Sequence, residues 1–165
     1  MASTGEVACF GKDKEEAYLK GMLATGGKIP EKGIFISLGG QQKKQDLLAS
    51  CKMLTKLNLP LYASEKTAAF LSENGIKTTM LYKIHEKKSP NILDHFQSHK
   101  IDLVINIVDK HIKKDFNDDF EIRRAASDNN ISLVTKAKTA EVLINALVEK
   151  GLIGLEVVPW SKYRE

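Results

Sequence analysis

Residues 33–148 alternate short β-favouring runs with segments of helical periodicity. In each helical segment apolar residues recur every three to four positions. Strands separated by helices are joined in parallel, because each crossover helix packs back on the sheet, almost always with the same hand. The pattern therefore predicts an α/β fold in which helices cover both faces of a parallel sheet. The five predicted strands are 34–38, 61–63, 78–81, 103–108 and 131–135.

The fourth run, 103–108, is the strongest strand pattern in the chain. A nearly continuous apolar run is typical of a strand whose two faces are both covered, so we expect it in the centre of the sheet. Asn106 interrupts the run near its carboxyl end, and a buried amide is costly unless its hydrogen bonds are met. Two kinds of partner remain open from the sequence: a bound ligand and a neighbouring loop backbone.

Composition narrows the class of protein. The chain has 165 residues, of which 42% are apolar, and a formal net charge of +4. This length favours one domain with a packed core, and no apolar run approaches the ~18 residues that cross a bilayer. Basic residues are not interleaved with aromatic ones, and Cys9 and Cys51 lie outside any zinc-ligand spacing. We therefore expect a soluble cytoplasmic protein with reduced thiols and without a metal, membrane or nucleic-acid partner.

Two segments flank the alternating region. Asp13 is placed to cap a helix that ends at Gly26-Gly27, and residues 26–33 read as a connector because glycine, proline and charge are concentrated there. At the other end, the apolar residues of 152–163 either pack back on the domain or dock elsewhere, and we expect packing.

Ligands of open parallel sheets bind beyond the carboxyl ends of the strands, so the residues that follow each strand are the candidate site. Each has a simpler alternative: a plain glycine turn, a helix cap at Ser64, or a solvated lysine. Hydroxyl groups at a helix N-terminus and nearby ammonium groups suit an anion such as phosphate. The candidates are Lys44 after Gly39-Gly40, then Ser64, Lys66 and Thr67 at a helix start, Lys83 after the third strand, and Asn106.

Other clusters are better explained without a ligand. His95 and His99 share a helix face but lack a third metal ligand at a diagnostic spacing. The acids Asp115, Asp118, Asp119 and Glu121 precede or open a helix, where its dipole favours them, and Arg123 and Arg124 are expected to pair with such acids. No grouping of a nucleophile with a histidine is identifiable, so no catalytic residue is predicted.

Six short segments, in order, resemble the C-terminal end of the carbamoyl phosphate synthase large subunit. The resemblance implies three parts. Residues 1–30 are the end of the second synthetase (ATP-grasp) unit together with a connector, residues 31–150 form a methylglyoxal-synthase-like regulatory domain, and residues 151–165 form a C-terminal tail. The resemblance also implies a sheet of order 3-2-1-4-5 and that the chain is a fragment. The segments are 3–7 (STGEV), 16–20 (EAYLK), 28–30 (KIP), 62–68 (YASEKTA), 104–106 (VIN) and 122–124 (IRR).

In relatives regulated by pyrimidine nucleotides, the effector phosphate is held by a loop similar to residues 64–67. The resemblance therefore implies UMP as effector, with IMP as a related one, and no catalytic role for this domain. It implies six effector-binding residues: Lys44, Ser64, Lys66, Thr67, Lys83 and Asn106. Some nucleotide-binding members carry a hydroxyl residue where this chain has Val108, which leaves part of the ribose or base contact unassigned.

Two alternatives stay open. The urea-cycle branch binds N-acetylglutamate, and residues 1–11 resemble it, but that branch has tryptophan where this chain has Lys83, and a lysine suits a phosphate better. Methylglyoxal synthase needs a carboxylate base to remove a carbon-bound proton. Asp109 is the matching acid, whereas the Gly-Gly-Asp loop of that enzyme has no counterpart in residues 87–91.

For the parent enzyme the resemblance implies an ATP-dependent ligase that uses Mg or Mn and serves pyrimidine and arginine synthesis. The expected partners are the rest of the large subunit, its glutaminase small subunit, and a second copy of the chain in a homo-oligomer.

Overall fold

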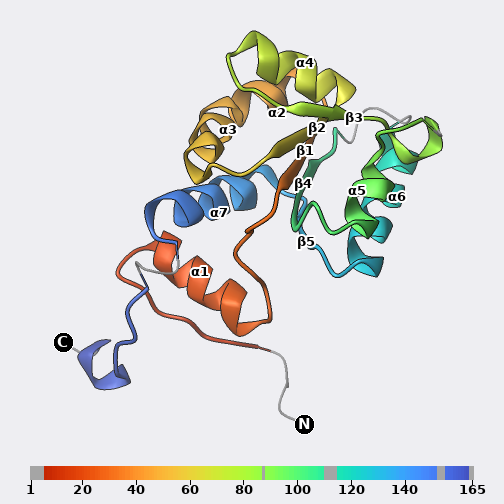
Figure 1. Ribbon diagram of the computed structural model, residues 1–165. Helices are drawn as coiled ribbons and strands as arrows, with labels where there is room; N and C mark the ends of the chain where they lie inside the picture. Colours follow the sequence, from red (N-terminus) through yellow and green to blue (C-terminus); the bar gives the residue numbers. More distant parts are fainter. Residues whose placement is uncertain (1–5, 87, 110–114, 152–154, 164–165) are drawn as a thin grey trace.

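A five-stranded parallel sheet forms the centre of the computed structural model, which describes residues 6–86, 88–109, 115–151 and 155–163 (Figure 1). The strand order β3-β2-β1-β4-β5 confirms the order 3-2-1-4-5. All four pairings are parallel. The strands are β1 (Ile34–Leu38), β2 (Leu61–Ser64), β3 (Thr79–Leu81), β4 (Leu103–Ile107) and β5 (Ser132–Val134).

Helices cover both faces of the sheet, so the three-layer α/β/α expectation is confirmed (Figure 1). Helices α3, α4 and α7 pack on one face, and α5 and α6 on the other. The helices are α1 (Lys14–Ala24), α2 (Gln41–Asp46), α3 (Leu48–Leu54), α4 (Glu65–Glu73), α5 (Ile92–Gln97), α6 (Asp115–Asp128) and α7 (Ala137–Glu149), with short 3-10 turns at Thr55–Leu57, Ile84–Glu86 and Trp160–Tyr163.

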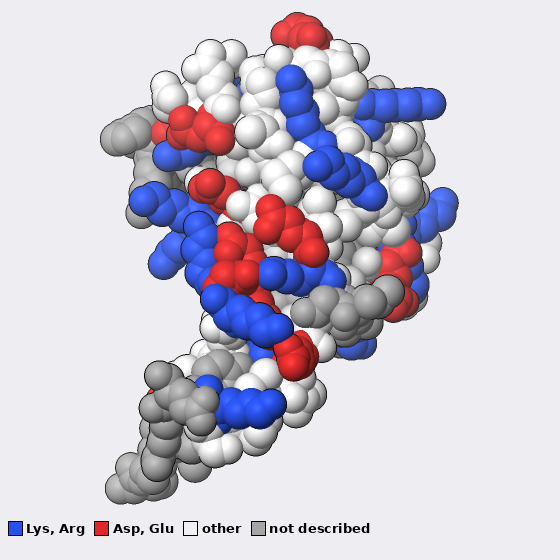
Figure 2. All heavy atoms as spheres, turned by 90° about the vertical axis from the view of Figure 1, so that its left-hand side faces the viewer, with Lys and Arg blue, Asp and Glu red and all other residues white. Residues whose placement is uncertain are grey.

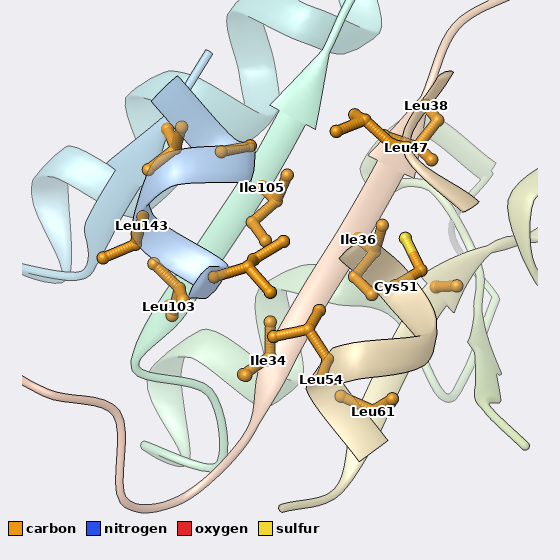
Figure 3. Packing of buried hydrophobic residues seen from close by; sticks show 14 of the residues in the cluster. Ile34, Ile36, Leu38, Leu47, Cys51, Leu54, Leu61, Leu103, Ile105 and Leu143 are labelled. Carbon is orange, nitrogen blue, oxygen red and sulfur yellow. The ribbon is translucent and has the colours of Figure 1, made fainter. Parts of the chain in front are cut away.

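The core follows from the alternation of side chains along β1. Ile34, Ile36 and Leu38 point toward α3 and α7, where they meet apolar side chains from both helices and from β4 (Figure 3). Phe35 points to the opposite face and packs edge-on against Phe96 of α5, with ring centroids 6.3 Å apart. Because β1 buries side chains on both faces, its sequence is an apolar run that only Ser37 interrupts.

Helices α5 and α2 show two features that the sequence pattern does not reveal. The sequence spacing places His95 and His99 on one helix face, but α5 ends at Gln97, and His99 lies beyond it in the left-handed region, where φ is 52°. The turn expected at Gly39-Gly40 leads directly into α2, a short helix with no buried residue. Because α2 has no buried face, its sequence lacks the apolar periodicity that indicates a helix.

Helix α1 is docked on the sheet domain. Asp13 caps it, as predicted, by accepting from Glu16 N at 2.8 Å. Leu19 is fully buried in the same core as β1, and Lys150 at the end of α7 pairs with Asp13 at 2.6 Å. Glu16 is also buried, and its carboxylate forms an ion pair with Lys20 Nζ at 2.7 Å and accepts from the Lys12 backbone N–H. These contacts lower the pKa of the carboxyl group below its usual value. The division of the chain near residue 30 stays a prediction.

The connector between α1 and β1 is held at the amino edge of the sheet by Asp102. Its carboxylate accepts from the backbone N–H groups of Glu31, Lys32 and Gly33 at 2.8, 3.0 and 3.2 Å. A short segment rich in glycine and charge is therefore tied to the residue that precedes β4.

The C-terminal tail packs only in part. Leu155 lies against the core that α1 and α7 share, and Glu156 pairs with Lys12. Val157 is 97% exposed, and the last turn, 160–163, lies away from the sheet in Figure 1. Leu152 and Ile153 of the predicted apolar set, like residues 1–5 of the family-like opening, lie outside the described residues.

Charges of both signs are interspersed on the face shown in Figure 2, where red and blue side chains alternate across the centre. None of the described helices combines the length and the apolar character that crossing a bilayer requires.

The packing of the core leads to a prediction about the reactivity of the Cys51 thiol. Cys51 on α3 is 2% exposed, and burial raises the pKa of its thiol to about 12 (Figure 3). In a Cys9→Ser chain at about pH 8, we expect Cys51 to react with a thiol reagent only after unfolding, because the thiolate is the reactive form. Absorbance of the released chromophore measures this. Rapid reaction of the folded chain would contradict the burial of α3.

Candidate functional site

A row of polar side chains crosses three strands at the carboxyl edge of the sheet. Ser37 of β1 is in register with Asn106 of β4, and the pairing of Ile36 with Ala63 places Ser64 of β2 beside Ser37. Residues in register point to the same face, here the face covered by α5 and α6. Two residues closer to the amino ends of the strands, the same face carries the side chains of Tyr62, Phe35 and Val104.

The row continues into a cluster of hydroxyl groups at the start of α4. Ser64 Oγ lies 3.2 Å from Ser37 Oγ and 3.1 Å from Thr67 Oγ1, and Leu38 N donates to Thr67 Oγ1 at 3.0 Å. A hydroxyl has one proton, so Ser64 donates to one neighbour while it accepts from the other. These groups can reorient to donate to an incoming anion.

Ser64 is the residue that precedes the first turn of α4, but its side chain makes no capping hydrogen bond to the helix backbone. The simpler alternative, in which the Ser64 hydroxyl serves only as the helix cap, is therefore wrong. The hydroxyl is taken up by the neighbouring side chains of Ser37 and Thr67.

Lys44 is brought to the same helix start from α2. Its Nζ donates to the carbonyl oxygen of Lys66 at 2.7 Å and lies 5.8 Å from the ring centre of Phe70. Partial burial, and next the positive charge of Lys66, lower the pKa of Lys44, while Glu73 acts in the opposite direction. Lys66 is exposed in the first turn of α4. The first turn of α4 thus carries one lysine and receives a second one from α2.

The turn after β1 packs tightly on the chain after β4. Gly39 N donates to Ile107 O at 2.7 Å, and a Cβ at Gly39 would lie 2.5 Å from Asp109 N. Gly40 has a φ of 72° and also faces the Asp109 carboxylate, so a side chain there would collide with that group. The two glycines are therefore required by close approach, and they place Asp109 at this edge of the sheet.

Asn106 has a partner that neither sequence alternative named. It is 3% exposed, and its Nδ2 donates to Asp119 Oδ1 of α6 at 2.8 Å. Arg123 Nε donates to the same oxygen at 2.6 Å, which confirms the expected pairing of this arginine with an acid. Among the residues that the structure describes, the partner of the Asn106 amide nitrogen is thus the side chain of Asp119.

Lys83 lies at the flank of this edge. It follows β3 by two residues, and the last residue of β3, Leu81, is in register with Ser64. Its backbone N donates to Glu86 Oε2 at 2.7 Å. At about 4.8 Å per strand, the ends of β3 and β4 are separated by roughly 14 Å.

Of the six predicted effector-binding residues, the structure gathers four at the start of α4 and sets two apart. Asn106 is separated from the cluster by Ser37, and Lys83 stands beyond the outer strand. The four gathered residues are Lys44, Ser64, Lys66 and Thr67. The binding role of all six stays a prediction.

Ser37 and Asp119 were missed from the sequence. Ser37 is the only polar residue in 34–38, and its place near the carboxyl end of its strand is the signal that drew attention to Asn106. Asp119 was explained by the helix dipole alone, and nothing in its spacing to Asn106 points to contact.

The histidine pair shows no sign of a metal site. His95 Nδ1 lies 3.1 Å from Asn91 O, and its ring packs edge-on against Tyr62 at 5.0 Å. Within the part of the chain that the structure describes, no three His, Cys, Asp or Glu residues are grouped to hold a metal ion. The side chains of Asp115 and Asp118 lie outside the described residues.

Thr67 offers a test of the hydroxyl cluster. We expect Thr67→Val to lower the free energy of unfolding by ~1–3 kcal/mol, because the shape is kept while the buried N–H of Leu38 loses its acceptor. Thr67→Ser, which keeps the hydroxyl, is the control and should lose less. Urea unfolding of the three chains measures the difference. Equal stability of Thr67→Val and the original chain would contradict the described hydrogen bond.

Comparison of the sequence with those of known proteins identifies relatives of this chain. The sequence model of a family described as the MGS-like domain matches residues 46–135. The multifunctional protein URA2 of Saccharomyces cerevisiae is 40% identical over 160 residues, which is 89% of this chain and 7% of that protein. The multifunctional protein CAD of Squalus acanthias is 36% identical over 161 residues, again 89% and 7%.

The carbamoyl phosphate synthase large chain of Clostridium botulinum is 36% identical over 146 residues, 88% of this chain and 14% of that protein. The chain thus spans between 7% and 14% of the length of these curated relatives. Among solved structures, methylglyoxal synthase from Elizabethkingia anophelis matches with a TM-score of 0.55 and 17% identity, over 84% of this chain and 96% of that one. At this identity the likeness shows a shared fold.

Proposed function

This chain belongs to the MGS-like domain family, and we propose that it is a non-catalytic, effector-binding regulatory domain of a carbamoyl phosphate synthase large subunit. The effector is a pyrimidine nucleotide of the UMP type, held at the carboxyl edge of the sheet. The relatives support the parent enzyme, because one is a carbamoyl phosphate synthase large chain and this chain matches a small part of it.

The observation that carries the proposal is the convergence of cations and hydroxyl groups on one helix start. Lys44 reaches the first turn of α4 by its bond to Lys66 O, and Ser64 and Thr67 join their hydroxyl groups at the start of the same helix. The Ser64 hydroxyl does not cap α4, and the positive end of this nine-residue helix favours an anion.

A phosphate monoester matches this arrangement better than a carboxylate does. It carries a charge of about −1.5 to −2 at neutral pH and three acceptor oxygens, which can take up several donors at once. Lys83 at the flank adds a cation where the N-acetylglutamate-binding branch has tryptophan. We therefore propose a nucleotide in preference to an acyl amino acid.

Regulation follows if the effector binds the active and inactive states of the parent enzyme with different affinity. Only such a difference shifts the populations, and a coupling of about 1–3 kcal/mol is ordinary. The parent is then an ATP- and Mg- or Mn-dependent ligase with a glutaminase partner, which supplies carbamoyl phosphate to pyrimidine and arginine synthesis. The residues of this domain bind and orient the effector and take no part in that chemistry.

The fold of methylglyoxal synthase does not by itself bring that activity. Elimination of phosphate needs a carboxylate base free to reach a carbon-bound proton. Asp109 is packed against the Gly39-Gly40 turn, and residues 87–91 lack the Gly-Gly-Asp sequence of that enzyme. An anion-binding edge without the Gly-Gly-Asp loop supports binding of a phosphate-bearing effector rather than elimination of its phosphate.

Calorimetric titration of the 165-residue chain with UMP tests the proposal. We expect saturable binding at one site, weakened about ten-fold or more by Lys44→Ala, because a charge-assisted contact to phosphate is lost. Lys43→Ala is the matched control, since Lys43 is the neighbouring lysine on α2 and should leave the affinity unchanged.

Titrations with N-acetylglutamate and dihydroxyacetone phosphate run in parallel. Binding of N-acetylglutamate without UMP would move the chain to the urea-cycle branch. Conversion of dihydroxyacetone phosphate to methylglyoxal would refute the non-catalytic role.

A further inference from the structure

The two ends of the polar row offer different hydrogen-bonding groups. At the α4 end stand donors: the ammonium group of Lys44 and the hydroxyl groups of Ser64 and Thr67. At the β4 end stands Asn106, whose nearest polar partner is a carboxylate. Two strand spacings, roughly 10 Å, separate Ser64 from Asn106 along the edge.

The orientation of the Asn106 amide follows from its partner. An aspartate carboxylate can only accept, so the amide nitrogen of Asn106 must face Asp119 on α6. The amide group is planar, and its oxygen therefore lies on the branch that faces away from Asp119. The oxygen is therefore an acceptor that Asn106 can still offer in a fixed direction, beside the second N–H of its nitrogen.

Asp119 is itself held in place. Arg123, one helical turn along α6, donates to the same Oδ1, and the Asp119 side chain is only 13% exposed. Arg123 offsets the negative charge of Asp119 but leaves the direction of the amide unchanged, because the shared oxygen remains an acceptor.

We infer that Asp119 is a positioning residue that fixes the Asn106 amide, so that the β4 end of the row accepts a hydroxyl or N–H group of the effector. This inference rests on the proposed function and adds an orientation of the bound effector. The phosphate lies at the start of α4, and the donor-bearing nucleoside portion lies toward β4. The resemblance counts Asn106 among six effector-binding residues, and the inference assigns it to the nucleoside portion of the effector.

Helix α6 supplies a matched control. Asp128 pairs with Arg124 through the same i,i+4 spacing as Asp119 with Arg123, at 3.6 Å, but its side chain is 65% exposed. Asp119→Asn and Asp128→Asn therefore remove the same charge from the same helix. Only the first releases the Asn106 amide, because an asparagine at 119 can either accept from it or donate to it.

Titration of both variants with UMP and with inorganic phosphate tests the inference. We expect Asp119→Asn to weaken UMP binding about ten-fold and phosphate binding by less than about two-fold, with Asp128→Asn unchanged for both. Equal losses for UMP and phosphate, or no loss of UMP affinity, would overturn the inference. Thermal unfolding of each variant establishes that it is folded.

A second measurement keeps the inference separate from the identity of the effector. In 15N–1H spectra without ligand, the side-chain NH2 of Asn106 is assigned by its loss in Asn106→Ala. We expect its hydrogen exchange to be about ten-fold faster in Asp119→Asn than in the original chain or in Asp128→Asn. If the chain binds neither UMP nor phosphate, the proposed function fails, and this exchange rate decides the inference alone: equal rates contradict it.

Discussion

Strand β1 pairs with β2 on one side and β4 on the other, and this double pairing determines where the remaining elements lie. In register at the amino end, Ile34 opposes both Leu61 and Leu103. Because all three strands run parallel, their carboxyl ends meet at one edge, and Ser37 comes to lie beside Asn106. Apolar layers cover both faces below, so these polar groups bond to one another and to α4 and α6.

The amino and carboxyl edges of the sheet carry different groups. At the amino edge Asp102 ties down the connector that leads from α1, while the proposed effector edge lies at the far end of the strands, about 16 Å away. Helix α1 packs against α7, which also contacts α3. A signal from the effector edge to α1 therefore has to pass along the strands or through α7.

Much of the fold is predictable because buried parallel strands leave a strong pattern. Residues 34–38 are predicted as a strand and form one, whereas the extent of α2 leaves no apolar pattern because none of its residues is buried. The strand order came from the resemblance, since periodicity does not reveal which strands pair. Asp119 was missed as a partner of Asn106 because a contact between β4 and α6 depends on how that helix packs, which local spacing does not encode.

The central claim is that the carboxyl edge binds the effector, and backbone amide shifts during a UMP titration followed by 15N–1H spectra test it most directly. We expect the largest shifts at Leu38, Gly39 and residues 64–67, with Asn106 also shifted and the connector around Asp102 unchanged. Shifts concentrated at the amino edge, or spread over α1 and the tail without the residues of the polar row, would contradict it.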